Sequence, residues 1–207
     1  MRDVLLVSYA EIPREIDTES IKALFDANEY IDAVVASSNE RTVVQRLAAL
    51  ELLARTLTLA NVDSKTLTLT RNERGRPSVA DRDGIDFSLS HTDRAVACAV
   101  MIGENARVGV DIEEEVPTER ADRLVKRFFS EEENVRTKRE GFAAVWTKKE
   151  ALFKYLDEQT ADYKSLDTEK RESEYIEVFE TEYGKVALCR AKNSKKKAKL
   201  TKIMLKN

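Results

Sequence analysis

The sequence of 207 residues contains one histidine, two cysteines, three prolines and six glycines. These low counts exclude a collagen-like chain, a disulfide-stapled scaffold and a low-complexity chain. No stretch approaches the roughly 18 consecutive apolar residues of a membrane-spanning helix, and the mean hydropathy is -0.47. With 42% hydrophobic residues, the chain still has enough apolar material for one large domain or two domains of about 100 residues.

The two cysteines, Cys98 and Cys189, lie in apolar runs and form no CxxC pair. Buried, reduced thiols therefore fit better than a disulfide or a zinc site. The apolar run at the N-terminus is interrupted by Glu11 and Arg14, which is too soon for a signal peptide. We expect a cytoplasmic protein without a membrane partner.

Charge is distributed unevenly along the chain. Residues 190–207 contain Arg190 and seven lysines but no acidic residue, so the body of the chain is acidic and the tail, 191–207, is basic. Such a tail can contact nucleic acid or anionic lipid, but a solvated and partly disordered end is the simpler interpretation. Because no basic face with interleaved aromatic residues occurs elsewhere, we expect no nucleic-acid partner.

Hydrophobic periodicity predicts alternating strands and helices. A helix is expected over 40–59, from an apolar stripe made of Val43, Leu47, Leu50, Ala54 and Leu57. A second long helix is expected over 140–156, after a loop that contains Pro117. The expected strands cover residues 4–9, 67–76, 86–90, 95–102, 107–113, 175–180 and 185–191.

Two short segments recur about half a chain apart. DRAVACAV at 93–100 is similar to YGKVALCR at 183–190, and ELLAR at 51–55 is similar to EALFK at 150–154. These similarities indicate two related lobes in tandem.

The segment VGVDIE places Asp111 and Glu113 two residues apart on an expected strand. Side chains alternate across a strand, so both carboxylates leave the same face. A cation relieves the repulsion between two like charges this close, and carboxylates suit Mg²⁺. An edge strand with two solvated acids is the alternative.

The segment WTKKEALFK at 146–154 places Lys149 near the middle of an apolar helix face. A lysine buried there needs an anion, and its compact ammonium suits a phosphate. A lysine that reaches along the apolar surface to solvent is the alternative. Glu150 and Lys154 lie one turn apart at the border of this face, where an ordinary surface pair would also fit.

The segment SLSHT contains Ser90 and the single histidine, His91, at the end of an expected strand. No pattern of a hydrolase triad surrounds them, but a hydroxyl and an imidazole can donate to phosphate oxygens. Arg46 and the Gly75–Arg76–Pro77 turn add cations to the same half of the chain. The first half thus supplies cations and hydroxyls, and the second supplies carboxylates and a lysine, as a polyphosphate with its metal would require.

Five motifs in this order resemble those of the 4'-phosphopantetheinyl transferases, especially the two-lobed, surfactin-synthetase-activating type. They are GRPSV (75–79), FSLSHT (87–92), VGVDIE (108–113), KRFFSEEE (126–133) and WTKKEALFK (146–154). The resemblance covers about residues 40–156. It implies an α+β fold of two similar tandem α/β lobes, a pseudo-dimer with lobes at 1–104 and 105–190, in a monomeric enzyme.

The resemblance also implies an activity. Such enzymes move the 4'-phosphopantetheine arm of coenzyme A to a serine of an apo acyl or peptidyl carrier protein, release 3',5'-ADP and require Mg²⁺. By motif position, Asp111, Glu113 and Glu150 would be the metal ligands, and Glu150 would accept the serine proton. Lys149 and Lys154 would contact the phosphates or neutralise the leaving group.

The remaining implied roles concern coenzyme A. Ser90 and His91 would bind its phosphates, with Arg46 as the partner of His91 at the 3'-phosphate. Arg76 and Pro77 would line the adenine side, and Arg76 replaces the usual lysine of the family motif.

The chain departs from the family pattern after Lys154, where YLDEQTADYKSLDTEKRESEY replaces a turn that contains glycine. A non-catalytic module that holds coenzyme A or a nucleotide is the alternative function. A scaffold whose partner binds the basic tail is a further possibility.

Overall fold

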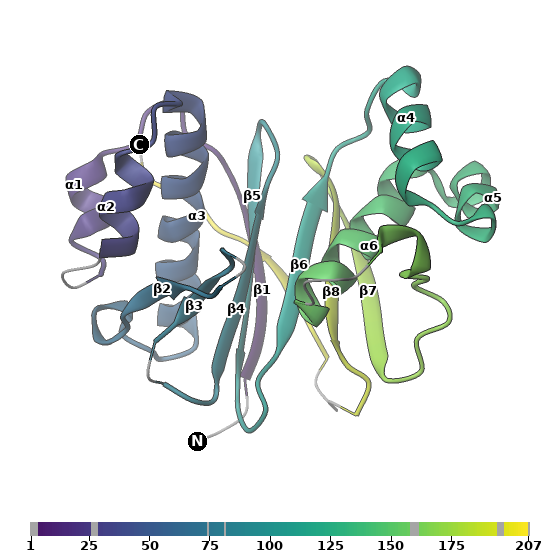
Figure 1. The fold of residues 1–207 in the computed structure, drawn as a ribbon. Helices are drawn as coiled ribbons and strands as arrows, with labels where there is room; N and C mark the ends of the chain where they lie inside the picture. The colour runs from purple at the N-terminus through teal and green to yellow at the C-terminus, as the bar shows by residue number, and fades with distance from the viewer. Residues whose placement is uncertain are drawn as a thin grey trace.

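The computed structural model describes residues 4–25, 29–73, 75–80, 82–157, 162–193 and 197–206. Two β-sheets pack against each other in the centre, and a long helix covers the outer face of each (Figure 1). The first sheet has the strand order β4-β5-β1-β9 and the second β6-β8-β7. The strands are β1 (Val4–Glu11), β4 (Ile85–His91), β5 (Ala95–Ile102), β6 (Val108–Glu113), β7 (Glu174–Thr181), β8 (Gly184–Ala191) and β9 (Leu200–Lys202).

The other elements surround these sheets. A small hairpin, β2 (Leu69–Arg71) and β3 (Pro77–Val79), lies beside the first sheet. The helices are α1 (Thr18–Lys22), α2 (Glu29–Val35), α3 (Glu40–Leu59), α4 (Thr118–Phe128), α5 (Glu131–Glu140) and α6 (Phe142–Leu156), with 3-10 turns η1 (Ser64–Thr66) and η2 (Tyr163–Ser165). None of the helices among the described residues is long and apolar enough to cross a bilayer.

Helix α3 has the bounds expected from the sequence. The side chain of Asn39 caps its N-terminus by accepting a hydrogen bond from the Thr42 amide at 3.0 Å. The predicted stripe packs on the outer face of the first sheet, with Leu47, Leu50 and Leu57 almost fully buried. Burial of this stripe against the sheet stabilises the helix far more than its intrinsic propensity does.

The two sheets meet through small and branched side chains. Strand β5 is buried along its whole length: Ala95, Ala97 and Ala99 pack with the second sheet, and the residues between them pack under α3. The second sheet contributes Val108, Val110, Ile112, Val186 and Leu188 to the same core. Because β5 has apolar neighbours on both faces, its sequence is a continuous apolar run, and the expected bounds of 95–102 are confirmed. Cys98 and Cys189 are buried, free thiols, as expected.

Helix α6 lies very close to strand β6 because of Gly109. A Cβ atom at this position would lie 2.1 Å from the carbonyl oxygen of Ala151 and 2.6 Å from the amide nitrogen of Tyr155. Asp111 and Glu113 share the face of β6 with Gly109, because side chains alternate along a strand. The missing side chain thus brings the helix over the two acidic residues.

The two halves share a core connectivity, to which the first half adds α1, α2 and the β2–β3 hairpin and the second adds α4 and α5. Each runs strand, long helix, hairpin, and in each sheet the first strand pairs with the second strand of the hairpin: β1 with β5, and β6 with β8. The recurring segments of the sequence fall on these corresponding elements, on α3 and α6 and on β5 and β8.

Two expectations from the sequence were wrong. The predicted strand over 67–76 is a short strand, β2, followed by a turn. The predicted loop around Pro117 contains α4, whose residues are all at least partly exposed and so give only a weak apolar pattern. α5 follows it; its first turn is closed by a capping box between Ser130 and Glu133.

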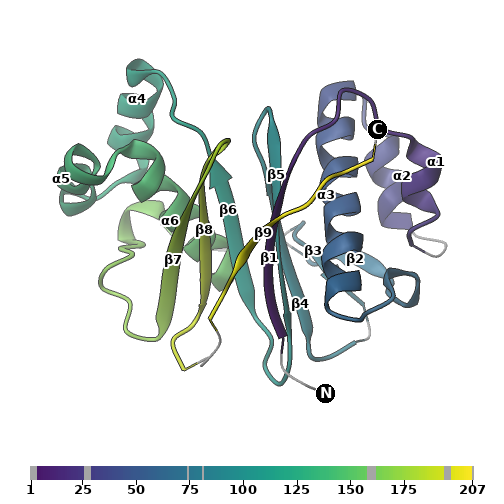
Figure 2. The same cartoon turned by 180° about the vertical axis from the view of Figure 1, so that it is seen from behind.

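The basic tail is also more ordered than expected. Strand β9 pairs in parallel with β1 (Figure 2). The Ile203 amide donates to the Tyr9 carbonyl at 2.9 Å. Ile203 and Leu205 pack on the core beneath α3. A solvated end is therefore wrong for the described residues 197–206.

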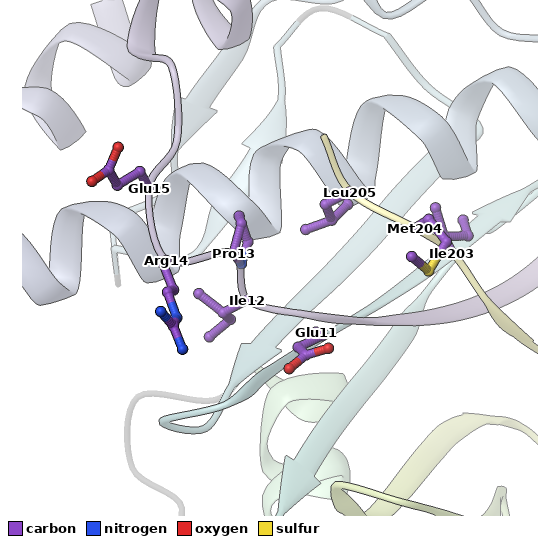
Figure 3. Close-up of a pocket in the computed structure, with 8 residues that line it drawn as sticks. All are labelled: Glu11, Ile12, Pro13, Arg14, Glu15, Ile203, Met204 and Leu205. Atoms are coloured by element: carbon purple, nitrogen blue, oxygen red, sulfur yellow. The ribbon is translucent and has the colours of Figure 1, made fainter. Parts of the chain in front are cut away.

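A pocket of about 570 Å³ opens where β1 and β9 separate (Figure 3). It is lined by Glu11, Ile12, Pro13, Arg14, Glu15, Ile203, Met204 and Leu205. None of the site residues predicted from the sequence lines it.

We predict that Gly109→Ala lowers the free energy of unfolding by at least about 2 kcal/mol, because the new methyl group collides with the backbone of α6. Urea unfolding would measure this. A variant as stable as the wild type would contradict the close approach of α6 to β6.

Candidate active site

Asp111 lies where the two halves meet. Its side chain is almost fully buried on β6, and its Oδ1 accepts hydrogen bonds from the Ser90 hydroxyl at 2.7 Å and from Lys154 Nζ at 2.8 Å. Ser90 is on β4 in the first sheet, and Lys154 is on the last turn of α6. The buried Oδ2 has no hydrogen-bond partner among the described residues. Asp111 is therefore not a solvated edge-strand acid, and it keeps an unused acceptor at the junction.

Glu113 and Glu150 lie near enough to Asp111 to feel its charge. Burial raises the pKa of Glu113, and the charge of Asp111 raises it further, to about 7, although Arg120 and Lys154 oppose the shift. Burial and then Asp111 also raise the pKa of Glu150. The structure thus brings the three predicted acids into one region of mutual repulsion, with Lys154 as a counter-ion.

The three carboxylates are ligands of the kind that a divalent cation prefers. Within the described part of the chain, no three carboxylate, histidine or cysteine side chains are gathered closely enough to hold a metal ion. The unpaired Oδ2 of Asp111 and the raised pKa values of its two neighbours are features that a cation would relieve.

A cleft of about 440 Å³ has Glu113 in its wall. Its walls come from both halves: Gln45, His91, Thr92, Asp93, Glu113, Glu114, Glu115, Val116, Pro117 and Arg120. Burial lowers the pKa of His91, and the charges of Lys154 and Arg46 lower it further, whereas Asp93 opposes the shift. Among the lining residues, His91 and Arg120 are the groups that suit an anion, and they lie beside four acidic side chains.

Glu150 has a partner that the sequence did not indicate. The Tyr163 hydroxyl donates to Glu150 Oε1 at 3.1 Å. Tyr163 belongs to η2, in the glycine-free segment after α6, where neither periodicity nor a motif marked it.

The guanidinium of Arg76 joins elements of both halves. Its nitrogens donate to the Asp86 carboxylate at 2.9 and 3.0 Å and to the carbonyls of Phe87 and Val108 at 2.9 Å. A further bond, of 3.0 Å, reaches the Lys154 carbonyl at the end of α6. The side chain therefore links β4, β6 and α6, and its expected place on the adenine side stays a prediction. Pro77 begins β3, beside this clamp.

Lys149 does not lie among the acids of the cleft. Its side chain is 0% exposed, and Nζ donates to Glu133 Oε2 and to the Leu166 carbonyl, both at 2.5 Å. The expectation that a lysine in an apolar face needs an anion is met by Glu133 of α5. The expected contact of Lys149 with a phosphate does not fit this structure, because the ammonium is enclosed by protein.

The second half of the chain is similar to known proteins. Residues 107–202 match the family model of the 4'-phosphopantetheinyl transferase superfamily. Over 104 residues the chain is 34% identical to the 4'-phosphopantetheinyl transferase HetI of Nostoc sp. (strain PCC 7120), in a match that covers 45% of this chain and 43% of that protein. The matched part thus spans less than half the length of the relative. Both matches support a transferase, and the family segment contains Asp111, Glu113, Glu150 and Lys154.

We predict that Lys149→Ala lowers the free energy of unfolding by about 3–5 kcal/mol, because Glu133 is left buried without its ammonium partner. The matched control is Lys148→Ala, which breaks a partly exposed pair with Glu140 and should cost at most about 1 kcal/mol. Thermal and urea unfolding would measure both. A stable Lys149→Ala protein that had lost coenzyme A binding would instead support the phosphate role.

We predict a pH-dependent gain in stability from Glu113→Gln in buffer with a chelator. Folding raises the pKa of Glu113 from 4.5 to about 7, so the folded state holds this proton more tightly than the unfolded state. Its contribution to stability is complete below pH 4.5 and is lost as the pH rises through 7. Above pH 7 the uncharged variant should be more stable than the wild type, by about 1–3 kcal/mol. Parallel pH profiles of the two proteins would contradict this prediction.

Proposed function

We propose that this protein transfers the 4'-phosphopantetheine arm of coenzyme A to a serine hydroxyl of an apo acyl or peptidyl carrier protein. The serine oxygen forms a bond to the β-phosphorus, the bond from that phosphorus to the 3',5'-ADP oxygen breaks, and the serine proton passes to a base. One observation carries the proposal: Asp111, within the transferase-family segment, is contacted by Ser90 and Lys154 from opposite sides of the junction.

The two halves form a pseudo-dimer in this proposal, with lobes at 1–104 and 105–190 and the tail, 191–207, returning to the first lobe. Their common connectivity supports it. Because both walls of the cleft come from one chain, a monomer is sufficient for activity. We place it in the cytoplasm, where carrier proteins are loaded.

Coenzyme A would lie in the cleft with its 3'-phosphate at His91 and Arg46. The cationic neighbours that lower the pKa of His91 supply the attraction for this phosphate. Ser90 and Lys154 would contact the pyrophosphate, since both lie on the Asp111 side of the cleft. Pro77 would contact the adenine side, whereas the guanidinium of Arg76 acts by holding the end of α6.

Asp111, Glu113 and Glu150 would hold Mg²⁺. When bound, the ion would neutralise charge on the pyrophosphate. Lys154, which pairs with Asp111 in this structure, would neutralise charge on the leaving group. Phosphoryl transfer depends mainly on such positioning and charge neutralisation.

Glu150 would accept the serine proton. Burial and the charge of Asp111 raise its pKa, which makes the carboxylate a better base than a solvated glutamate. Its place on α6, one turn before Lys154, puts the base and the phosphate-neutralising cation on the same side of the helix.

The carrier protein would dock on the segment from Val116 to Lys126, at the rim of the cleft. This segment contains most of α4, where Arg120, Arg123 and Lys126 are exposed. Exposed basic side chains beside partly buried apolar ones suit an acidic carrier protein.

We predict that the purified protein, with Mg²⁺ and coenzyme A, adds about 340 Da to an apo carrier protein, the mass of the transferred arm. Intact-mass spectrometry of a small panel of apo carriers would detect the product. Asp111→Ala and Glu150→Ala should each abolish transfer, whereas Glu104→Ala, in the exposed turn between β5 and β6, should leave it unchanged.

A carrier with its acceptor serine changed to alanine should gain no mass. Coenzyme A binding by calorimetry without transfer to any carrier would favour a binding module and contradict the enzyme.

A further inference from the structure

The segment after α6 holds Tyr163 in a fixed place beside Glu150. Its ring stacks on Trp146 of α6, with centroids 5.9 Å apart and planes 23° apart. The same ring contacts Phe153 at 4.6 Å and Phe128 of α4 at 5.1 Å. An aromatic ring packed on three others has little freedom to turn, so the direction of its hydroxyl is set by the cluster.

The backbone around Tyr163 is anchored as firmly as its ring. Asp162 caps the short turn by accepting from the Lys164 amide at 3.2 Å. Three residues later, the Leu166 carbonyl accepts from the buried Lys149 ammonium. Next to it, Asp167 accepts from Arg136 of α5 at 3.0 Å. The buried ion pair of α5 and α6 thus fixes the loop that carries Tyr163.

The hydroxyl of this anchored residue meets one carboxylate oxygen, Glu150 Oε1, at 3.1 Å. Packing alone would be served equally well by phenylalanine, and the hydroxyl raises the cost of burial unless it is hydrogen bonded. The role of the Tyr163 hydroxyl therefore lies in its hydrogen bond to Glu150. A donor fixed on Oε1 limits rotation of the carboxylate and leaves Oε2 for another partner.

We propose that Tyr163 is a positioning residue, whose hydroxyl sets the orientation of the Glu150 carboxylate for its work in the cleft. The inference rests on the proposed function, in which Glu150 holds Mg²⁺ and accepts the serine proton. It assigns a role to the glycine-free segment that replaces the family's turn. It also gives the buried Lys149 an indirect part, since Lys149 holds the loop through Leu166.

The decisive variant is Tyr163→Phe, which removes the hydroxyl and keeps the ring. We expect it to weaken Mg²⁺ binding about tenfold and to raise the KM for Mg²⁺ by a similar factor. The KM for coenzyme A and the Tm should stay at the wild-type values, because the aromatic cluster remains. Calorimetric titration with Mg²⁺, with and without coenzyme A, measures the affinity on the full chain, and initial rates give the KM values.

The matched control is Tyr175→Phe, which removes a hydroxyl from an exposed tyrosine on β7 and should change neither value. A double-mutant cycle with Glu150→Ala shows whether the hydroxyl acts through Glu150. In that background, Tyr163→Phe should cause no further loss of Mg²⁺ affinity.

Two results would overturn the role of Tyr163. One is wild-type Mg²⁺ affinity and KM in Tyr163→Phe. The other is a Tm lowered together with all affinities, which would make the hydroxyl structural only. If the wild-type protein itself shows neither Mg²⁺-dependent heat nor transfer, the proposed function fails, and the role of Tyr163 falls with it.

Discussion

The close approach of α6 to β6 is the constraint on which the site depends. Gly109 leaves no room for a side chain, since even a Cβ would lie 2.1 Å from the Ala151 carbonyl oxygen. At this separation, Lys154 reaches Asp111 at 2.8 Å, and the charge of Asp111 reaches Glu150. Arg76 holds the same end of α6 by donating to the Lys154 carbonyl. The backbone contact is therefore a condition for the site, because it brings Glu150 of the helix within reach of the charge of Asp111 on the strand.

Two lysines of α6 that carry buried or partly buried ion pairs differ in their surroundings. The pair of Lys149 and Glu133 is fully enclosed and joins α5 to α6, so its role is structural. Lys154 is partly exposed beside Asp111, and in the proposed function it contacts a phosphate. Two lysines five residues apart on one helix thus have different roles, because α5 covers one of them and the cleft adjoins the other. Burial, rather than residue type, decides which charge a ligand can reach.

Much of the fold could be predicted from periodicity, because α3 and β5 are buried in regular patterns that the sequence displays. The motifs also identified Ser90, Asp111 and Lys154, which the structure brings together. The partner of Lys149 could not be predicted, since a helix pattern shows that a lysine is buried but not which neighbouring helix supplies the anion. Tyr163 could not be found either: its position depends on an aromatic cluster formed by residues distant in sequence. The C-terminal strand β9 could not be predicted because a strand of three residues, Leu200–Lys202, is too short to show a hydrophobic alternation.

We propose that the cleft beside Asp111 binds coenzyme A for transfer. A crystal structure of the protein with coenzyme A and Mg²⁺ would show where the ligand lies. We expect the 3'-phosphate beside His91 and Arg46, and the pyrophosphate beside Lys154 with the metal among Asp111, Glu113 and Glu150. Coenzyme A bound elsewhere, for example in the pocket between β1 and β9, with Asp111 still paired to Lys154, would contradict it.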